Sequence, residues 1–150
     1  MRPSQFSVGL LSYKIIGWVC VVFFLGCSIG AYFARQYGPI TIFMFFVLMG
    51  VYMIVSAGSY TLNDESVTHT NVFGSFHILW QNVRQIEVGT QGTLVLHGND
   101  QRFILAPATF WSGRDKPEAF ALLTKKIEDL DITPYPSNVA DYKIHKNVRV

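Results

Sequence analysis

The chain has few charged side chains and very few cysteines, and both shortages limit what it can be. Charged residues make up 15% of its 150 residues, and the formal net charge is only +2 at pH 7. So small an excess gives no sign of a nucleic-acid partner, and we expect none. Both cysteines, Cys20 and Cys27, lie in one apolar stretch. We therefore expect neither a disulfide nor a cysteine-ligated metal site.

Motifs that carry known chemistry are also missing. The chain contains no Gly-x-Ser-x-Gly and no glycine loop that would cradle a phosphate before a helix. Its four histidines lack the paired spacing of metal ligands, although His69 and His77 could face each other across a hairpin. A metal there would lack further ligands, so ordinary strand residues are the favoured interpretation. We expect a non-catalytic protein with no cofactor and no bound metal.

Two long apolar stretches, 15–34 and 40–57, contain no charged side chain. A helix of about 20 apolar residues, rising about 1.5 Å per residue, is long enough to cross a bilayer. Backbone polar groups cannot stay unpaired in lipid, so each stretch must be helical. The short elbow between them ends in Pro39, which is tolerated at the start of a helix. The sequence therefore predicts a transmembrane helical hairpin over 15–58.

The first apolar stretch could instead be a secretory signal, because residues 24–27 outline a lipoprotein cleavage box. The stretch is longer than the roughly 7–15 residues of a signal core, and a second apolar stretch follows at once. These two features favour an uncleaved hairpin. Arg2 and Lys14 precede the first helix and further basic residues follow the second. By the positive-inside rule, both termini are expected in the cytoplasm.

Gly26, Gly30 and Ala34 recur every four residues in the first apolar stretch. This spacing puts small side chains on one helix face, where another helix backbone can approach closely. The nearest partner is the second helix of the hairpin. The alternative is a helix of another membrane protein, which would make the stripe a site of assembly.

After residue 58 the apolar pattern changes to a period of two, which is typical of short antiparallel strands. A cluster of Gly98, Asn99 and Asp100 predicts a hairpin turn between the last two of them. Residues 118–130 form an amphipathic helix whose apolar face can cover the open end of a bent sheet. The predicted strands are 60–62, 67–71, 75–79, 83–88, 93–97 and 101–105. The predicted divisions of the chain are an N-terminal tail (1–14), the hairpin (15–58), a soluble domain (59–131) and an extended tail (132–150).

Three features together carry a resemblance to a known family. The hairpin is followed by Tyr-Thr-Leu-Asn-Asp-Glu-Ser-Val at 60–67, by Ile-Leu-Trp-Gln-Asn-Val-Arg-Gln-Ile-Glu-Val at 78–88 and by a terminal helix. This layout resembles the bacterial pleckstrin-homology-like (PH-like) membrane proteins over residues 15–130. The resemblance implies an α+β domain, a PH-like bent antiparallel sheet or half-barrel capped by a C-terminal helix. It also implies residence in the bacterial inner membrane and a role in binding or scaffolding.

The usual ligand site of PH domains is not expected to work here. Domains that bind phosphoinositides place several Lys and Arg side chains around the first hairpin loop, because clustered cations hold phosphate. In this chain that loop, residues 63–66, reads Asn-Asp-Glu-Ser. Its acidic side chains would repel phosphate.

Four residues are candidates for contact with a partner or with the membrane surface. Trp111 lies in an irregular segment and is expected to be partly exposed, with core packing as the equal alternative. Lys143, Lys146 and Arg149 make the C-terminal tail basic. The tail could be disordered, clamp anionic lipid, or lie as an extended arm along a neighbouring subunit.

These observations favour a non-catalytic accessory or assembly subunit of a larger integral membrane protein complex. Its contacts would be the first helix, the soluble domain and the tail. The alternative is a stand-alone, membrane-anchored module that binds lipid or another ligand. Membrane lipids are expected neighbours in both cases.

Overall fold

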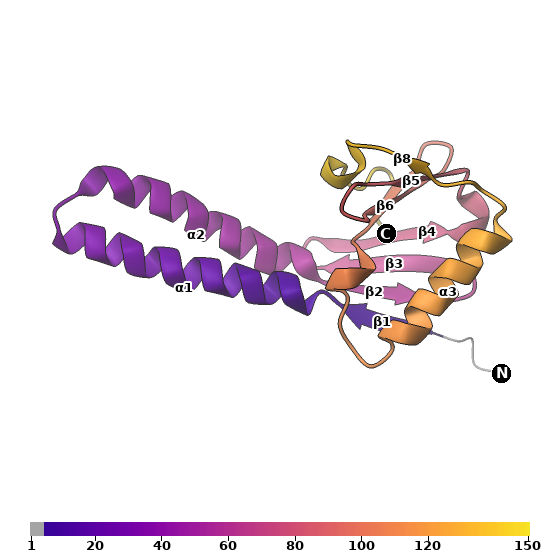
Figure 1. Cartoon of the computed structure of the whole chain (residues 1–150), viewed down its shortest axis with the longest axis horizontal. Coiled ribbons are helices and arrows are strands. Elements are labelled where there is room, and N and C mark those ends of the chain that lie inside the picture. Colours follow the sequence, from indigo (N-terminus) through magenta and orange to yellow (C-terminus); the bar gives the residue numbers. More distant parts are fainter. Residues whose placement is uncertain (1–4) are drawn as a thin grey trace.

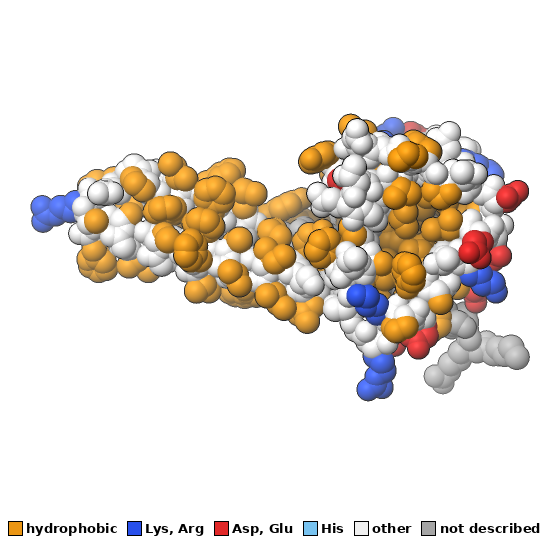
Figure 2. All heavy atoms as spheres, in the orientation of Figure 1, with side chains coloured by type: hydrophobic (Ala, Val, Ile, Leu, Met, Phe, Trp, Pro, Cys, Tyr) orange, Lys and Arg blue, Asp and Glu red, His pale blue; other side chains and the backbone are white. Residues whose placement is uncertain are grey.

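The computed structural model describes residues 5–150 and consists of a long helical hairpin attached to a small sheet domain (Figure 1). The hairpin is formed by α1 (Leu11–Phe33) and α2 (Tyr37–Ala57). Both helices are long and apolar enough to cross a membrane, and only 17% of the most apolar window of each is buried. Figure 2 shows apolar side chains along the whole exposed length of the hairpin. The prediction of two long apolar helices is confirmed.

The two helices approach most closely at a pair of glycines near the sheet domain. A Cβ atom on Gly50 would lie 2.8 Å from the carbonyl oxygen of Gly17, and a Cβ on Gly17 would lie 2.8 Å from that of Gly50. The neighbouring Val21 and Val47 are buried in the same contact. Helix association in lipid depends on such close packing of small residues. The contact between α1 and α2 therefore uses Gly17 and Gly50.

The stripe of Gly26, Gly30 and Ala34 does not take part in this contact. No atom lies within 4 Å of a Cβ built on Gly26 or Gly30, and all three residues are exposed. The interpretation that α2 covers the stripe is wrong. The reason is the helical period: Gly26 lies nine residues, or about two and a half turns, after Gly17, so it points to the opposite side of α1.

The sheet domain contains two four-stranded sheets. Their neighbouring strands are antiparallel, except that the short β8 runs parallel to β5. In order across the sheets, the first consists of β1 (Phe6–Gly9), β2 (Ser59–Leu62), β3 (Ser66–Asn71) and β4 (Gly74–Leu79), and the second of β7 (Arg102–Leu105), β6 (Leu94–His97), β5 (Gln85–Val88) and β8 (Tyr135–Pro136). A short 3-10 helix at Trp80–Asn82 connects the two sheets; in the described residues, two others lie at Ala108–Phe110, after β7, and at Ala140–Tyr142, after β8. The predicted antiparallel sheet domain is confirmed.

The first strand comes from the chain before the hairpin. β1 pairs with β2 in antiparallel register, from Phe6 opposite Leu62 to Gly9 opposite Ser59. Val8 is fully buried in the core. The division of residues 1–14 as a tail is therefore corrected over its described part: residues 6–9 form a strand, and α1 begins at Leu11. Residues 1–4 of that division lie outside the described chain. The hairpin is an insertion between two paired strands of one domain.

Helix α3 (Lys116–Asp129) packs on the first sheet, at β1 and β2 (Figure 1). Its apolar face buries Ala119 and Leu123, as the sequence pattern predicts. The irregular segment before it folds over the same core, with Trp111 only 3% exposed and its indole N–H donating to the Ala106 carbonyl. The expectation that Trp111 is partly exposed is wrong. Ser112 pairs with Gly9 of β1 and fixes this segment over the core.

The last residues, 137–150, form an extended segment that we call the C-terminal strap. Its backbone exchanges two hydrogen bonds with Arg102 of β7, at Lys146, and accepts one from His77 of β4, at Val148. The strap therefore bridges the free edges of β4 and β7, although the two sheets do not close into a continuous barrel. Val148 is buried in the core. An open strand edge is a site of aggregation, and the strap covers two of them.

Candidate functional site

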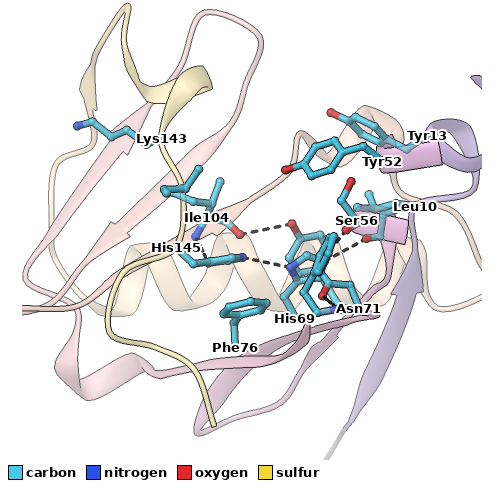
Figure 3. Close-up of a pocket in the computed structure, with 14 residues that line it drawn as sticks. Leu10, Tyr13, Tyr52, Ser56, His69, Asn71, Phe76, Ile104, Lys143 and His145 are labelled. Atoms are coloured by element: carbon cyan, nitrogen blue, oxygen red, sulfur yellow. Dashed lines mark hydrogen bonds between the residues drawn. The ribbon is translucent and has the colours of Figure 1, made fainter. Parts of the chain in front are cut away.

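A cavity of about 520 Å³ lies where the base of the hairpin, the first sheet and the C-terminal strap meet (Figure 3). Most of its lining is aromatic or aliphatic, and a few polar side chains converge on it. We call it the hairpin-base cavity. The residues that shape it include Tyr13 of α1, Tyr52 of α2, His69 of β3, Phe76 of β4, Ile104 of β7 and His145 of the strap.

A chain of hydrogen bonds joins the strap to the hairpin across this cavity. The Ile104 backbone N–H donates to Nδ1 of His145 (3.1 Å), so this nitrogen carries no proton. Nε2 of His145 lies 3.1 Å from Nδ1 of His69, and Nε2 of His69 lies 3.0 Å from the Ala57 carbonyl oxygen. The network thus assigns each neutral ring its tautomer, with Nε2–H donating in both. Every ring nitrogen of the pair is used.

Both histidines are held in the neutral form by their surroundings. Burial lowers the pKa of His69, and it lowers the pKa of His145 to about 4, with a further contribution from His69. The rings also stack on aromatic neighbours, His145 on Phe76 and His69 on Tyr60, each with centroids 4.5 Å apart. A proton added to either ring would remove an acceptor nitrogen from the chain of hydrogen bonds.

We expect the fold to lose stability in mild acid because of this pair. The ordinary histidine pKa of 6.5 applies to the unfolded chain, and the folded values are lower. The unfolded state therefore binds protons first, so the contribution is full above about pH 6.5 and declines until the pH falls below about 4. For His145 the loss between pH 7 and pH 5 is about 2 kcal/mol. Denaturant unfolding of the full chain at pH 7 and pH 5 measures it. His145→Gln should flatten the pH dependence, and His77→Gln should not; equal slopes in both variants would contradict the assignment.

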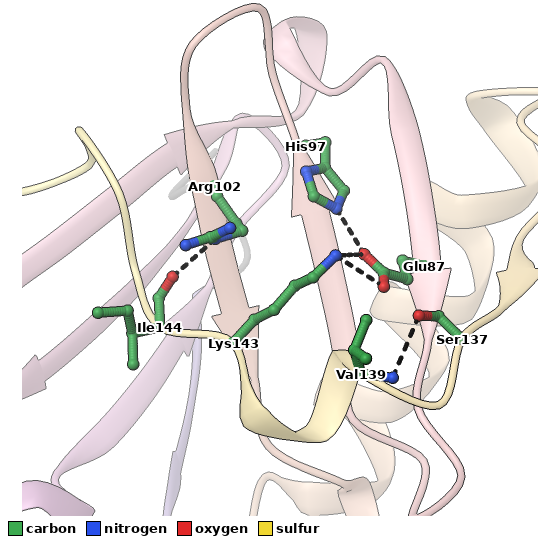
Figure 4. A network of polar contacts seen from close by, with 7 residues as sticks. All are labelled: Glu87, His97, Arg102, Ser137, Val139, Lys143 and Ile144. Atoms are coloured by element: carbon green, nitrogen blue, oxygen red, sulfur yellow. Dashed lines mark hydrogen bonds and ion pairs between the residues drawn. The ribbon is translucent and has the colours of Figure 1, made fainter.

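A second polar cluster ties the strap to the second sheet (Figure 4). The carboxylate of Glu87, on β5, is 1% exposed and accepts two hydrogen bonds from the Lys143 ammonium, at 2.6 and 2.8 Å. Nε2 of His97 lies 2.8 Å from the same carboxylate. Burial by itself would raise the pKa of Glu87, but hydrogen bonds from Lys143, Ser137 and His97 hold it at about 2. The carboxylate is fully engaged, which leaves it no capacity to act as a base.

The predicted contact residues are found mostly in internal contacts. Trp111 lies in the core rather than at the surface, and Lys143 binds Glu87; contact of either residue with a partner stays a prediction. Lys146 pairs with Asp100 at 2.8 Å, and Arg149 donates to the Phe73 carbonyl at 2.9 Å. Both of these side chains stay at the surface, and their contact with a partner or with lipid stays a prediction.

Contacts with its own sheet domain hold the C-terminal tail in place, which the sequence did not indicate. Of the apolar residues of the tail, Val148 is buried, whereas Tyr142 and Ile144 stay exposed, so the apolar pattern of the tail did not indicate how it docks. The pairing of His69 with His77 is wrong, because the strand register places His77 opposite Thr68, on the other face of the sheet. The true partner, His145, lies 76 residues away.

Within residues 5–150, no group of three or more His, Cys, Asp or Glu side chains could hold a metal ion.

No family model matches this chain, and no curated protein or solved structure shows significant similarity to it. Its function must therefore follow from its own geometry. The features available are the hairpin-base cavity, the two faces of α1 and the docked strap.

Proposed function

We propose that the protein is a non-catalytic binding module, held in the bacterial inner membrane by its hairpin, whose ligand occupies the hairpin-base cavity. The cavity carries this proposal. Ligand sites in proteins are typically concave, mostly apolar and about 300–1,000 Å³ in volume, with a few convergent polar groups. The hairpin-base cavity, at about 520 Å³, has each of these properties.

The exposed surface of the hairpin supports membrane insertion. Large apolar side chains such as Trp18, Val22 and Phe33 are more than half exposed along α1. An apolar surface of this extent is incompatible with water but suits hydrocarbon. α1 begins at the sheet domain and α2 ends at it, so a hairpin that crosses the bilayer leaves the domain and its cavity on one side. The basic residues flanking the hairpin favour the cytoplasmic side.

The arrangement of strands supports a PH-like domain. β1 to β4 form one antiparallel sheet, β5 to β7 belong to the other, and α3 follows them in the chain. The strand before the hairpin supplies the one that residues 59–131 lack for a seven-stranded fold. The acidic loop at 63–66 still argues against phosphoinositide, so the proposed site is the cavity rather than that loop.

The second candidate is an accessory subunit of a larger membrane protein complex, and the uncovered stripe on α1 favours it. The helix has two faces of small residues. Gly17 is used in the contact with α2, whereas Gly26 and Gly30 face open space. Glycines gain little by packing against lipid tails, but they allow a second helix backbone to come close. In this case the partner contact is made within the membrane.

One purification tests both candidates. The tagged full-length protein is extracted in mild detergent, and native mass spectrometry identifies what stays bound. A retained small molecule that Ile104→Trp removes, and Phe120→Trp keeps, supports the binding module, because Ile104 lines the cavity and the exposed Phe120 of α3 does not. A stoichiometric protein that Gly30→Leu removes, and Gly38→Leu on α2 keeps, supports the accessory subunit. A Cβ atom at Gly30 would have open space within 4 Å, so the loss of a partner in Gly30→Leu would not reflect a damaged hairpin. Recovery of the bare protein would contradict both candidates.

A further inference from the structure

We propose that the ligand of the hairpin-base cavity is an uncharged lipid-like amphiphile that enters from the bilayer. Its head would carry hydroxyl or carbonyl oxygens and would lie at the phenols of Tyr13 and Tyr52, with its hydrocarbon chain directed into the cavity toward Ile104 and the strap. This inference rests on the proposed binding function and names the chemistry of the ligand.

The position of the cavity sets the route of entry. Its lip is formed by Tyr52 of α2, which is 62% exposed, and by Phe73 at the turn between β3 and β4, which is 47% exposed. The two rings lie 6.1 Å apart, and the Val72 N–H donates to the Val55 carbonyl of α2. This apolar lip is continuous with the exposed apolar surface of α2. A hydrocarbon chain can therefore pass from lipid into the cavity without crossing water.

The charges around the cavity exclude an ionic head. Among the described residues that line it, none is acidic and the only lysine or arginine is Lys143. The ammonium of Lys143 is bound to Glu87, and Figure 3 shows it directed away from the cavity. His69 and His145 are neutral, with every ring nitrogen engaged. The carboxylate of Asp141, whose charge acts on Tyr13, already accepts hydrogen bonds from residues 90–91. A charged head would lose its hydration here, which is costly, and no lining side chain of opposite charge is free to pair with it.

The uncharged polar side chains of the cavity determine which head group of the ligand fits. The Ser56 hydroxyl donates to the Met53 carbonyl, and the Asn71 amide donates to the Ser56 carbonyl. Figure 3 shows the phenols of Tyr13 and Tyr52 on the hairpin side of the cavity, with no hydrogen bond drawn to either. Each phenol can donate one hydrogen bond and accept another. A hydroxyl or carbonyl oxygen satisfies them without bringing charge.

Photolabelling of the full-length protein in lipid nanodiscs tests the proposal. Three probes share one diazirine-bearing acyl chain and differ only in the head: glycerol, glycerol phosphate or trimethylammonium. Labelling of strap residues 138–146 reports the cavity, because lipid around the hairpin labels α1 and α2 instead. The glycerol probe should label the strap at least tenfold more than either charged probe.

Variants locate the site and its polar contacts. Ile104→Trp should reduce strap labelling at least tenfold by filling the cavity, and Phe120→Trp, at an exposed position of α3 away from the cavity, should leave it unchanged. The double variant Tyr13→Phe with Tyr52→Phe keeps the shape of the cavity and should reduce labelling by the glycerol probe about fivefold.

The outcomes distinguish an error in the ligand class from an error in the binding function. Equal or stronger strap labelling by a charged probe would overturn the uncharged class while leaving a binding module in place. Unchanged labelling in the phenylalanine double variant would also overturn the proposed head contacts. Absence of strap labelling by all three probes would overturn both the ligand class and the lipid-binding use of the cavity.

Discussion

Replacing Lys143 by methionine should destabilise the soluble domain by about 3–5 kcal/mol, the cost of leaving a buried carboxylate without its partner. Glu87 is 1% exposed, and Lys143 supplies two of its hydrogen bonds. Methionine matches the length of the lysine stem but removes the ammonium, so the carboxylate keeps only the weaker contacts with Ser137 and His97. Denaturant unfolding of the full chain in detergent measures the change. Hydrogen exchange of residues 138–150 should accelerate in the same variant, because Lys143 fastens the strap.

A matched control and a rescue accompany this prediction. Lys146→Met breaks the exposed pair with Asp100 and should change stability far less, since solvent screens such pairs. Combining Lys143→Met with Glu87→Gln removes the buried charge and should recover most of the loss. If Lys143→Met cost no more than Lys146→Met, the ion pair would not be what holds the strap.

Gly50→Leu should have the largest effect within the hairpin. Even a Cβ atom at this position would lie 2.8 Å from the Gly17 carbonyl oxygen and 3.0 Å from Val21. Overpacking of a core costs about 1–3 kcal/mol, and here the obstacle is backbone, which cannot rotate away. We therefore expect a loss of about 3 kcal/mol or more, measured by unfolding the detergent-solubilised protein with increasing SDS.

Gly26→Leu is the control on the opposite face of α1. It introduces the same side chain into open space, so the hairpin should keep its stability. If Gly50→Leu kept the stability of the unchanged protein, the contact between Gly17 and Gly50 would be contradicted. If Gly26→Leu lost as much stability as Gly50→Leu, the assignment of two distinct faces would be contradicted.

These contacts matter for the proposed binding function because the hairpin-base cavity is lined by residues from several different elements. Tyr13 and Tyr52 come from the hairpin, His69 from the first sheet and His145 from the strap. Moving the hairpin by a variant at Gly50, or freeing the strap by a variant at Lys143, should therefore weaken ligand binding together with stability. The cavity depends on both anchors.

The local pattern of apolar and charged residues was sufficient to predict most of the secondary structure. The absence of charge over 15–34 and 40–57 predicted α1 and α2, although each helix begins three or four residues earlier than expected. Alternation of apolar residues predicted β2 to β7, each within two residues of its bounds, and the helical period predicted α3. These features follow from neighbours within one or two turns of the chain, so a single sequence contains them.

The sequence by itself determined that the chain has an apolar hairpin, a set of short antiparallel strands and an amphipathic helix. Only the tertiary structure decided that residues 6–9 complete the first sheet, that the strap docks on its own domain and that His69 meets His145. It also decided which glycines of α1 face α2. Each of these depends on residues far apart in the chain: Phe6 lies opposite Leu62 because the hairpin brings its two ends together. Four extended residues carry no strong local signal, and their conformation depends on the partner strand that folding brings beside them.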